Sequence, residues 1–109
     1  MSDQKTISVN DISLCNEKSF VLIGGLNVLE TRELAFIVAD AFREISSRLQ
    51  IPYIFKASFD KANRSSMESF RGPGMEEGLR ILEEIKQAFE IPVLTDIHES
   101  QQAKPVSEI

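Results

Sequence analysis

Three short apolar segments separated by two amphipathic segments constrain the fold of this chain most strongly. The apolar runs at 20–23, 53–56 and 91–95 have the length and composition of buried strands. Apolar residues recur at intervals of three and four over residues 31–49 and 75–89, which predicts a helix in each interval. Strands joined through helices in this order run parallel, so the sequence predicts an α/β protein.

Each predicted helix has a suitable first turn and one apolar face. Thr31 is a good N-cap for the first helix, and Glu76 and Glu77 lie in the first turn of the second, where the helix dipole favours acidic residues. The predicted inner face of the first helix consists of Leu34, Ile37, Val38, Ala41, Phe42, Ile45 and Leu49. The predicted inner face of the second helix consists of Met75, Leu79, Leu82, Ile85 and Phe89.

The N-terminal segment has the pattern of a β-hairpin. Two short strand-like segments, 7–9 and 12–14, flank Asn10 and Asp11, a pair that tolerates the left-handed backbone of a tight turn. We therefore expect a hairpin region over residues 1–19, followed by strands and helices of a single domain over residues 20–109. Two folds share this pattern, a doubly wound open sheet and the first part of a (β/α)8 TIM barrel.

Polar residues follow each predicted strand at its C-terminal end. Asn27 follows the first strand, Lys56 and Lys61 belong to the end of the second, and Asp96 and His98 follow the third. Both candidate folds bind ligands at this end of their strands. The sequence therefore predicts a functional site built from these three loops.

The loop after the second strand has the composition of an anion-binding segment. Residues 56–66 contain two lysines, one arginine, one asparagine and three serines, and the only acids between Lys56 and Arg71 are Asp60 and Glu68. Hydroxyl and amide donors beside cations suit a phosphate or a carboxylate, and Arg71 adds a further cation just before the second helix. A solvated charged connection is the other interpretation of this loop.

The residues that could bind metal are few. His98 is the only histidine, and with Asp96 and Glu99 beside it the set is a weak one for a transition metal. On spacing alone a metal role is the weaker interpretation, and we predict neither a metal nor a cofactor. Cys15 is the only cysteine, which excludes an internal disulfide, and it is better interpreted as a packing residue than as a nucleophile.

Composition limits the classes of partner. A chain of 109 residues with a formal net charge of -5 lacks the broad basic face that nucleic acids and anionic membrane surfaces require. No apolar stretch approaches the ~20 residues of a membrane span, and the N-terminus lacks the apolar core of a signal peptide. We expect a cytoplasmic protein that binds neither nucleic acid nor membrane.

Four motifs in order resemble one enzyme family. KASFDKANRSS, with GGLNVLE before it and FRGPG and TDIHES after it, resembles the N-terminal part of the 3-deoxy-D-manno-octulosonate 8-phosphate synthases, also called 2-dehydro-3-deoxyphosphooctonate aldolases. The resemblance implies the first three strands and first two helices of a TIM barrel, with a third helix begun. It also implies condensation of phosphoenolpyruvate with arabinose 5-phosphate in lipopolysaccharide biosynthesis. By this resemblance residues 1–109 alone lack a complete active site.

The resemblance also implies roles for individual residues. Lys56 and Lys61 face the phosphoenolpyruvate carboxylate and the reacting centre with Ser58 beside them, and Lys61 also reaches the sugar. The residues implied to bind substrate are Lys56, Ser58, Lys61, Asn63, Arg64 and Ser65, with Arg64 and Ser65 on the sugar phosphate across a subunit interface of a homotetramer. The residues implied to act in catalysis are Lys61, Asn27, Asp96 and His98. Asn27 stands where metal-dependent members have a cysteine, so the resemblance implies catalysis without metal.

Two other functions stay open at this point. The chain could be a small non-catalytic α/β module that binds a sugar phosphate or another anion. It could also belong to a sibling class of phosphoenolpyruvate-dependent synthases that make a seven-carbon sugar acid, although KANRSS suits the octulosonate enzymes better.

Overall fold

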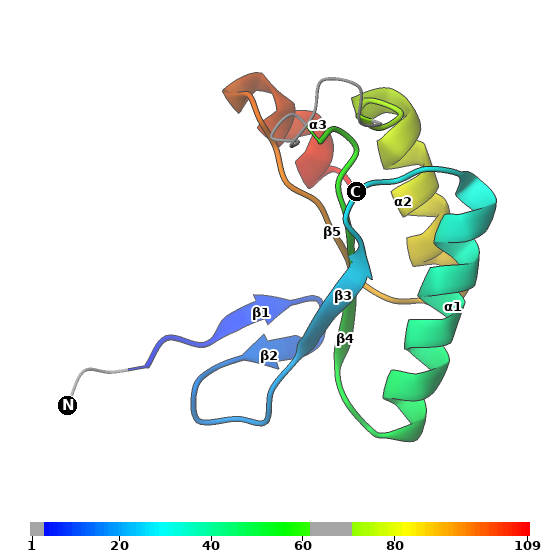
Figure 1. Cartoon of the computed structure of the whole chain (residues 1–109). Coiled ribbons are helices and arrows are strands. Elements are labelled where there is room, and N and C mark those ends of the chain that lie inside the picture. The colour runs from blue at the N-terminus through cyan, green and yellow to red at the C-terminus, as the bar shows by residue number, and fades with distance from the viewer. Residues whose placement is uncertain (1–3, 62–70) are drawn as a thin grey trace.

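The computed structural model describes residues 4–61 and 71–109, which form a parallel sheet, two long helices and an N-terminal hairpin (Figure 1). The elements in chain order are β1 Ile7–Val9, β2 Ile12–Leu14, β3 Leu22–Leu26, α1 Arg32–Arg48, β4 Tyr53–Ala57, α2 Met75–Phe89, β5 Val93–Leu94, the 3-10 turn η1 Ser100–Gln102 and α3 Ala103–Ser107. The predicted α/β class is confirmed, because β3, β4 and β5 pair in parallel in that order.

The first sheet strand differs from its prediction. β3 begins at Leu22 and passes through both glycines to Leu26, whereas the predicted segment started at Phe20 and ended before Gly24. β3 pairs with β4 without a break, from Leu22 opposite Tyr53 to Leu26 opposite Ala57. Glycine has a low strand propensity, so it is this pairing that keeps Gly24 and Gly25 in the strand. Phe20 lies outside the strand and is exposed.

The bounds of α1 were predicted well, but much of its predicted inner face is wrong. Thr31 caps the helix, accepting a hydrogen bond from the Leu34 amide at 3.0 Å. Val38 and Phe42 pack against the core as expected. The fully buried positions of this helix are instead the small residues Ala35, Ala39 and Ser46. The residues of the predicted face that are exposed are Ile37, Ala41, Ile45 and Leu49.

The second helix and the hairpin agree with their predictions. α2 runs from Met75 to Phe89, with Leu79, Leu82 and Ile85 buried and Glu76 and Glu77 in its first turn. β1 and β2 pair antiparallel, and Asn10 in their turn has φ 53°. In the described part of the chain, none of the helices has the length and apolarity needed to cross a membrane.

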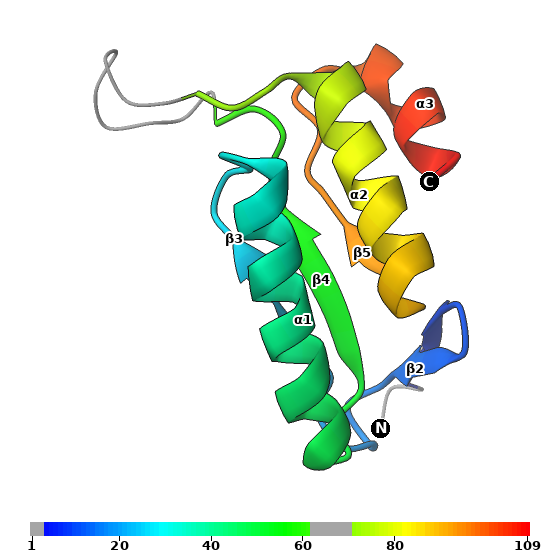
Figure 2. The same cartoon turned by 90° about the vertical axis from the view of Figure 1, so that its right-hand side faces the viewer.

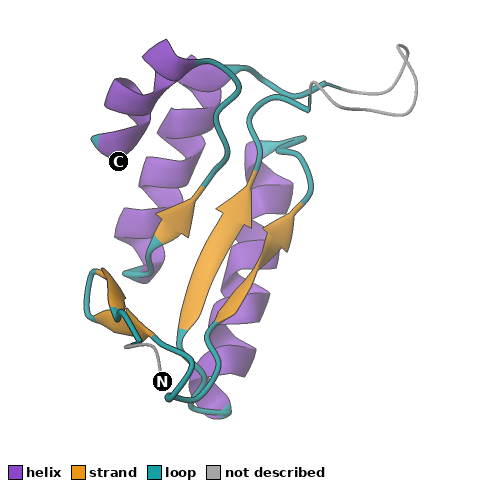
Figure 3. Cartoon of the chain, turned by 90° about the vertical axis from the view of Figure 1, so that its left-hand side faces the viewer, coloured by secondary structure: helices purple, strands orange, loops and turns teal. Residues whose placement is uncertain are grey.

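In the described part of the chain, helices cover one face of the sheet and leave the other open. Figures 2 and 3 view the sheet from opposite sides, with α1 and α2 in front of it in Figure 2 and behind it in Figure 3. Side chains alternate along a strand, so Phe55 and Ala57 of β4 point into the helical core, whereas Ile54 and Lys56 point the other way. In the described residues this second face carries partly exposed apolar side chains, among them Ile23 and Leu94.

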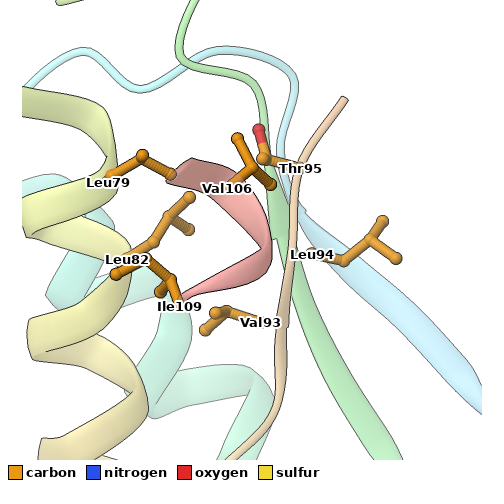
Figure 4. Close-up of a pocket in the computed structure, with 7 residues that line it drawn as sticks. All are labelled: Leu79, Leu82, Val93, Leu94, Thr95, Val106 and Ile109. Carbon is orange, nitrogen blue, oxygen red and sulfur yellow. The ribbon is translucent and has the colours of Figure 1, made fainter. Parts of the chain in front are cut away.

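The C-terminal segment completes the packing on the helical side. Figure 4 shows Val106 and Ile109 beside Leu79 and Leu82 of α2, around a cavity of about 30 Å³. Leu94 lies on the opposite side of β5 in the same view. The segment after β5 is therefore held against α2 by apolar contact, which fixes the direction in which the chain leaves the strand.

Candidate functional site

The C-terminal ends of β3, β4 and β5 lie together at one end of the sheet, as Figure 3 shows. The loops that leave β3 and β4 are joined by a hydrogen bond from the Leu29 amide to the Ser58 carbonyl at 2.9 Å. Asn27 leaves β3 at this end and is exposed, and its neighbour Leu26 pairs with Ala57. Asp96 and His98 follow β5 at the same end. The predicted convergence of the three loops is therefore present.

A chain of hydrogen bonds joins Lys56, Ser58 and Asp96. The Lys56 ammonium donates to the Ser58 hydroxyl at 3.2 Å, and that hydroxyl donates to Oδ1 of Asp96 at 2.5 Å. Lys56 projects from β4 on the face of the sheet that the described helices leave open, and Ser58 directly follows β4, where its hydrogen bond places the hydroxyl beside the ammonium. Ser58 is fully buried, which fixes its hydroxyl between a cation and a carboxylate.

The surroundings of Asp96 favour its ionised form. Partial burial acts to raise the pKa, but the hydrogen bond from Ser58, a backbone hydrogen bond and the charges of Lys56 and His98 outweigh it and lower the pKa of Asp96 below the ordinary value of 3.8. Asp96 is therefore a carboxylate at neutral pH. A carboxylate held by a hydroxyl beside an ammonium forms a fixed dipole at the C-terminal ends of β4 and β5.

His98 links the loop after β5 to the loop after β4. Its Nε2 lies 2.5 Å from the carbonyl oxygen of Asp60 and 3.6 Å from Oδ2 of Asp96. A carbonyl oxygen can only accept a hydrogen bond, so Nε2 carries a proton and donates a hydrogen bond to the Asp60 carbonyl. The imidazole edge also meets the ring of Phe59, with centroids 6.1 Å apart. This geometry occupies Nε2, so the lone pair that neutral His98 can offer to a substrate or ion is on Nδ1.

Arg71 is paired with the carboxylate of Asp60. Its Nε donates to Oδ1 of Asp60 at 2.6 Å and its Nη2 to Oδ2 at 3.3 Å, so the guanidinium fork is engaged by a carboxylate of the same loop. These hydrogen bonds and the nearby charge raise the pKa of Arg71 above its ordinary value. In this structure Arg71 is therefore a cation paired with a carboxylate, and its contribution to an anion site stays a prediction.

With this geometry in view, comparison with known proteins decides the family. The sequence model of the DAHP synthetase I family matches residues 3–109. This chain belongs to the DAHP synthetase I family. As a member, it is 59% identical over 107 residues to the 2-dehydro-3-deoxyphosphooctonate aldolase of Pseudoalteromonas translucida, which confirms the resemblance read from the four motifs.

Other relatives of this family member carry the same name. The protein of Colwellia psychrerythraea is 59% identical over 105 residues, and that of Azotobacter vinelandii is 59% identical over 106 residues. The alignments cover 96% and 97% of this chain but 38% of each relative, and the Pseudoalteromonas alignment covers 98% and 38%. The chain thus spans about 38% of the length of these relatives.

The residues predicted to form the site in this family member fall into three groups. Lys56, Ser58, Asp96 and His98 are brought together by the hydrogen bonds described above. Asn27 and Lys61 lie at the same end of the sheet without belonging to that network. Asn63, Arg64 and Ser65 lie outside the described residues.

The sequence pattern does not predict the pairing of Asp60 with Arg71. In the sequence Asp60 is only one of two acids in a basic segment. The signal available was its position, because an acid before residues 62–70 and an arginine directly after them can close the ends of a loop.

Proposed function

We propose that this chain is part of an enzyme that condenses phosphoenolpyruvate with D-arabinose 5-phosphate to 3-deoxy-D-manno-octulosonate 8-phosphate and inorganic phosphate. The observation that carries the proposal is the Lys56–Ser58–Asp96 network at the carboxyl ends of parallel strands. Relatives 59% identical to this chain bear the name of that activity. The reaction would serve lipopolysaccharide biosynthesis in the cytoplasm.

We infer that β3, β4 and β5 are strands of a (β/α)8 barrel rather than of a doubly wound sheet. Among the described residues β3 and β5 each pair on one side only, and the sheet face carrying Ile23 and Leu94 is uncovered, as the inner wall of a barrel would be before closure. Beside α1 an apolar groove of about 210 Å³ offers a place for a further helix. Its lining residues are Leu22, Ala41, Phe42, Ile45, Ser46, Leu49 and Ile51.

The chemistry requires cations, because both substrates carry several negative charges. In the reaction carbon 3 of phosphoenolpyruvate attacks the sugar aldehyde, whose oxygen takes up a proton. Water adds at carbon 2 and gives up one proton, which balances the proton taken up by the aldehyde oxygen. When the bond from carbon 2 to the phosphate oxygen breaks, the remaining hydroxyl proton passes to the leaving phosphate, so that inorganic phosphate leaves and a ketone remains. Lys56 and Lys61 at one end of the sheet would offset the repulsion between the substrates in a site of reduced dielectric.

Each residue then has a defined part. Lys56, oriented by Ser58, binds the carboxylate of phosphoenolpyruvate, while Lys61 faces the reacting centre, where charge develops. Asp96 and His98 line the floor and position water, and Asn27 borders the site from the end of β3. From the resemblance alone, Asn63 reaches the sugar, and Arg64 and Ser65 bind its phosphate across a subunit interface in a homotetramer.

A hybrid protein tests the proposal. Residues 1–109 of this chain replace the matching 38% of the Pseudoalteromonas relative, and release of phosphate and formation of the eight-carbon product are measured with both substrates. The unaltered relative is the positive control. We expect turnover of the same order in the hybrid. A folded hybrid that binds both substrates without forming product would overturn the proposal and favour the non-catalytic anion-binding module.

Two variants of the hybrid separate the proposed roles. Arg64→Ala removes charge-assisted bonds to a phosphate, so the KM for arabinose 5-phosphate should rise about tenfold to a hundredfold and that for phosphoenolpyruvate much less. Lys61→Ala should lower kcat instead, because it removes a charge that acts as the transition state forms. Equal effects of Arg64→Ala on both KM values would contradict the assignment.

A further inference from the structure

We propose that Asp60 and Arg71 form a positioning pair that fixes the main chain at Lys61, and that Arg71 does not itself bind substrate. The inference rests on the proposed function, in which Lys61 faces the reacting centre. It assigns two residues outside the predicted site to that function. The pair is named the stem pair below, and the stem is defined as residues 59–61, its outgoing side, and residues 71–74, its returning side.

The two residues are joined through both side chain and main chain. The guanidinium of Arg71 binds both oxygens of the Asp60 carboxylate, at 2.6 and 3.3 Å. Directly beside this fork, the amide of Lys61 donates to the carbonyl of Arg71 at 2.6 Å. A bidentate fork has one favoured geometry. It therefore keeps the two sides of the stem aligned so that the Lys61 amide can donate to the Arg71 carbonyl.

Phe59 packs the stem against α2 and joins its outgoing and returning sides. The Gly74 amide donates to the carbonyl of Phe59 at 3.0 Å, and Phe59 itself is buried. Gly72 has φ 121°, and a Cβ there would lie 2.4 Å from the Phe59 carbonyl oxygen. A Cβ at Gly78, in the first turns of α2, would lie 2.3 Å from the Phe59 Cβ. Glycine at both positions lets the stem pack directly on the helix.

The outgoing side of the stem is fixed on the loop after β5. His98 donates from Nε2 to the carbonyl of Asp60, and the same nitrogen lies 3.6 Å from the carboxylate of Asp96. Asp60 is thus held through its carbonyl by the loop after β5 and through its carboxylate by Arg71. Lys61 is the next residue, so its place relative to the Lys56–Ser58–Asp96 network is set by these contacts.

Magnitudes separate a positioning role from a role in stability. The Arg71 side chain is 59% exposed, and an ion pair exposed to this degree contributes little to stability. Displacement of a catalytic group by about 1 Å can lower a rate a hundredfold. The stem pair should therefore matter far more for turnover than for folding.

The chain offers a matched control for the test. Arg80 and Glu77 on α2 form another ion pair, at 2.6 Å, in which the arginine side chain is also 59% exposed. The test variants are Asp60→Asn, Arg71→Ala, the double variant and the exchanged pair Asp60→Arg with Arg71→Asp, and the control is Arg80→Ala. Amide hydrogen exchange at Lys61 is measured on the full 109-residue chain without substrate, and kcat and KM are measured in the hybrid.

The expected results are specific to a coupled pair. Each single change should speed exchange at Lys61 about tenfold by freeing its amide, with exchange in the middle of α2 unchanged. Each should lower kcat about tenfold with small changes in KM, and the double variant should be no worse than the worse single variant. The exchanged pair should recover part of kcat, and Arg80→Ala should change nothing.

Two results would overturn the inference. A rise in KM for Arg71→Ala with a fall in KM for Asp60→Asn would show that Arg71 binds substrate and that Asp60 competes for it. Unchanged exchange at Lys61 in both single variants would show that the pair does not hold the stem. A hybrid without turnover would count against the proposed function only, because the exchange measurement needs no catalysis.

Discussion

Replacement of Ser58 by alanine tests the central network most directly. Ser58 is fully buried and its hydroxyl makes two hydrogen bonds, accepting from Lys56 at 3.2 Å and donating to Asp96 at 2.5 Å. The alanine variant leaves the ammonium and the carboxylate without their shared partner. It adds no bulk, so the effect reports on the hydrogen bonds rather than on packing.

The magnitude follows from the charges and the exposure. A hydrogen bond to a charged group contributes about 1.5–3 kcal/mol, but water can replace part of it here because the Asp96 side chain is 46% exposed. We therefore expect Ser58→Ala to lower the free energy of unfolding by about 2 kcal/mol rather than by the sum of two bonds.

The chain contains a control serine. Ser46 is also buried, but its hydroxyl donates at 3.2 Å to the neutral carbonyl of Arg43 within α1. Loss of this neutral bond costs about 1 kcal/mol, and the higher helix propensity of alanine returns about half of that. Ser46→Ala should thus be close to neutral.

The two variants should also differ in their response to pH. The pKa of Asp96 is lower in the folded state than its ordinary value of 3.8. Ionised Asp96 therefore stabilises the fold at pH values above 3.8, and this stabilisation disappears as the pH falls through the folded pKa. Ser58→Ala raises that pKa, so its cost should be full at neutral pH and shrink in strong acid. Ser46→Ala should show no such dependence.

The assay is urea unfolding followed by circular dichroism, at one fixed chain concentration and at several pH values. The difference between the two serine variants at neutral pH is the measured quantity. Equal costs for both, or a cost for Ser58→Ala that persists unchanged in strong acid, would refute the role assigned to the network.

Three further predictions follow from single features. Burial raises the pKa of Tyr53, the only tyrosine, whose hydroxyl donates to the Gly24 carbonyl at 2.8 Å, so tyrosinate absorbance should appear only well above pH 10.0 until the chain unfolds. Ile45 is 48% exposed and lines the apolar groove of α1, so we expect the chain to self-associate through this face and Ile45→Lys to reduce that association in sedimentation, and an unchanged profile would exclude this face as its cause. The hybrid should stay active after dialysis against a strong chelator, because Asn27 offers a neutral amide rather than a thiolate, and activity restored only by added divalent metal would contradict this.

The sequence predicted element bounds well where local chemistry sets them. Thr31 supplies a side-chain cap, and Asn10 accepts the left-handed backbone of the hairpin turn. The face of α1 was harder to predict, because the apolar pattern gives most weight to large side chains. The helix buries Ala35 and Ala39 instead, which allows it to lie close to the sheet and leaves Ile37 and Ile45 outward.

The candidate site shows the same limit at the level of single contacts. Ser58 and Asp96 lie 38 residues apart, and they meet because β4 and β5 are neighbours in the sheet. The sequence placed both at strand ends but did not predict that they share a hydrogen bond. That bond depends on strand order and register, which a pattern of apolar residues does not specify.

Lys56 and Arg71 are both cations of the predicted anion site, but they have different partners in the structure. An ammonium has three N–H donors, and Ser58 accepts one of those on Lys56, so Lys56 is oriented while donors remain for a substrate carboxylate. The guanidinium of Arg71 instead gives both arms of its fork to Asp60. Lys56 keeps N–H donors for a ligand although its charge also acts on Asp96, whereas the guanidinium of Arg71 is paired directly with a carboxylate. This difference is why we assign Lys56 to binding and Arg71 to positioning.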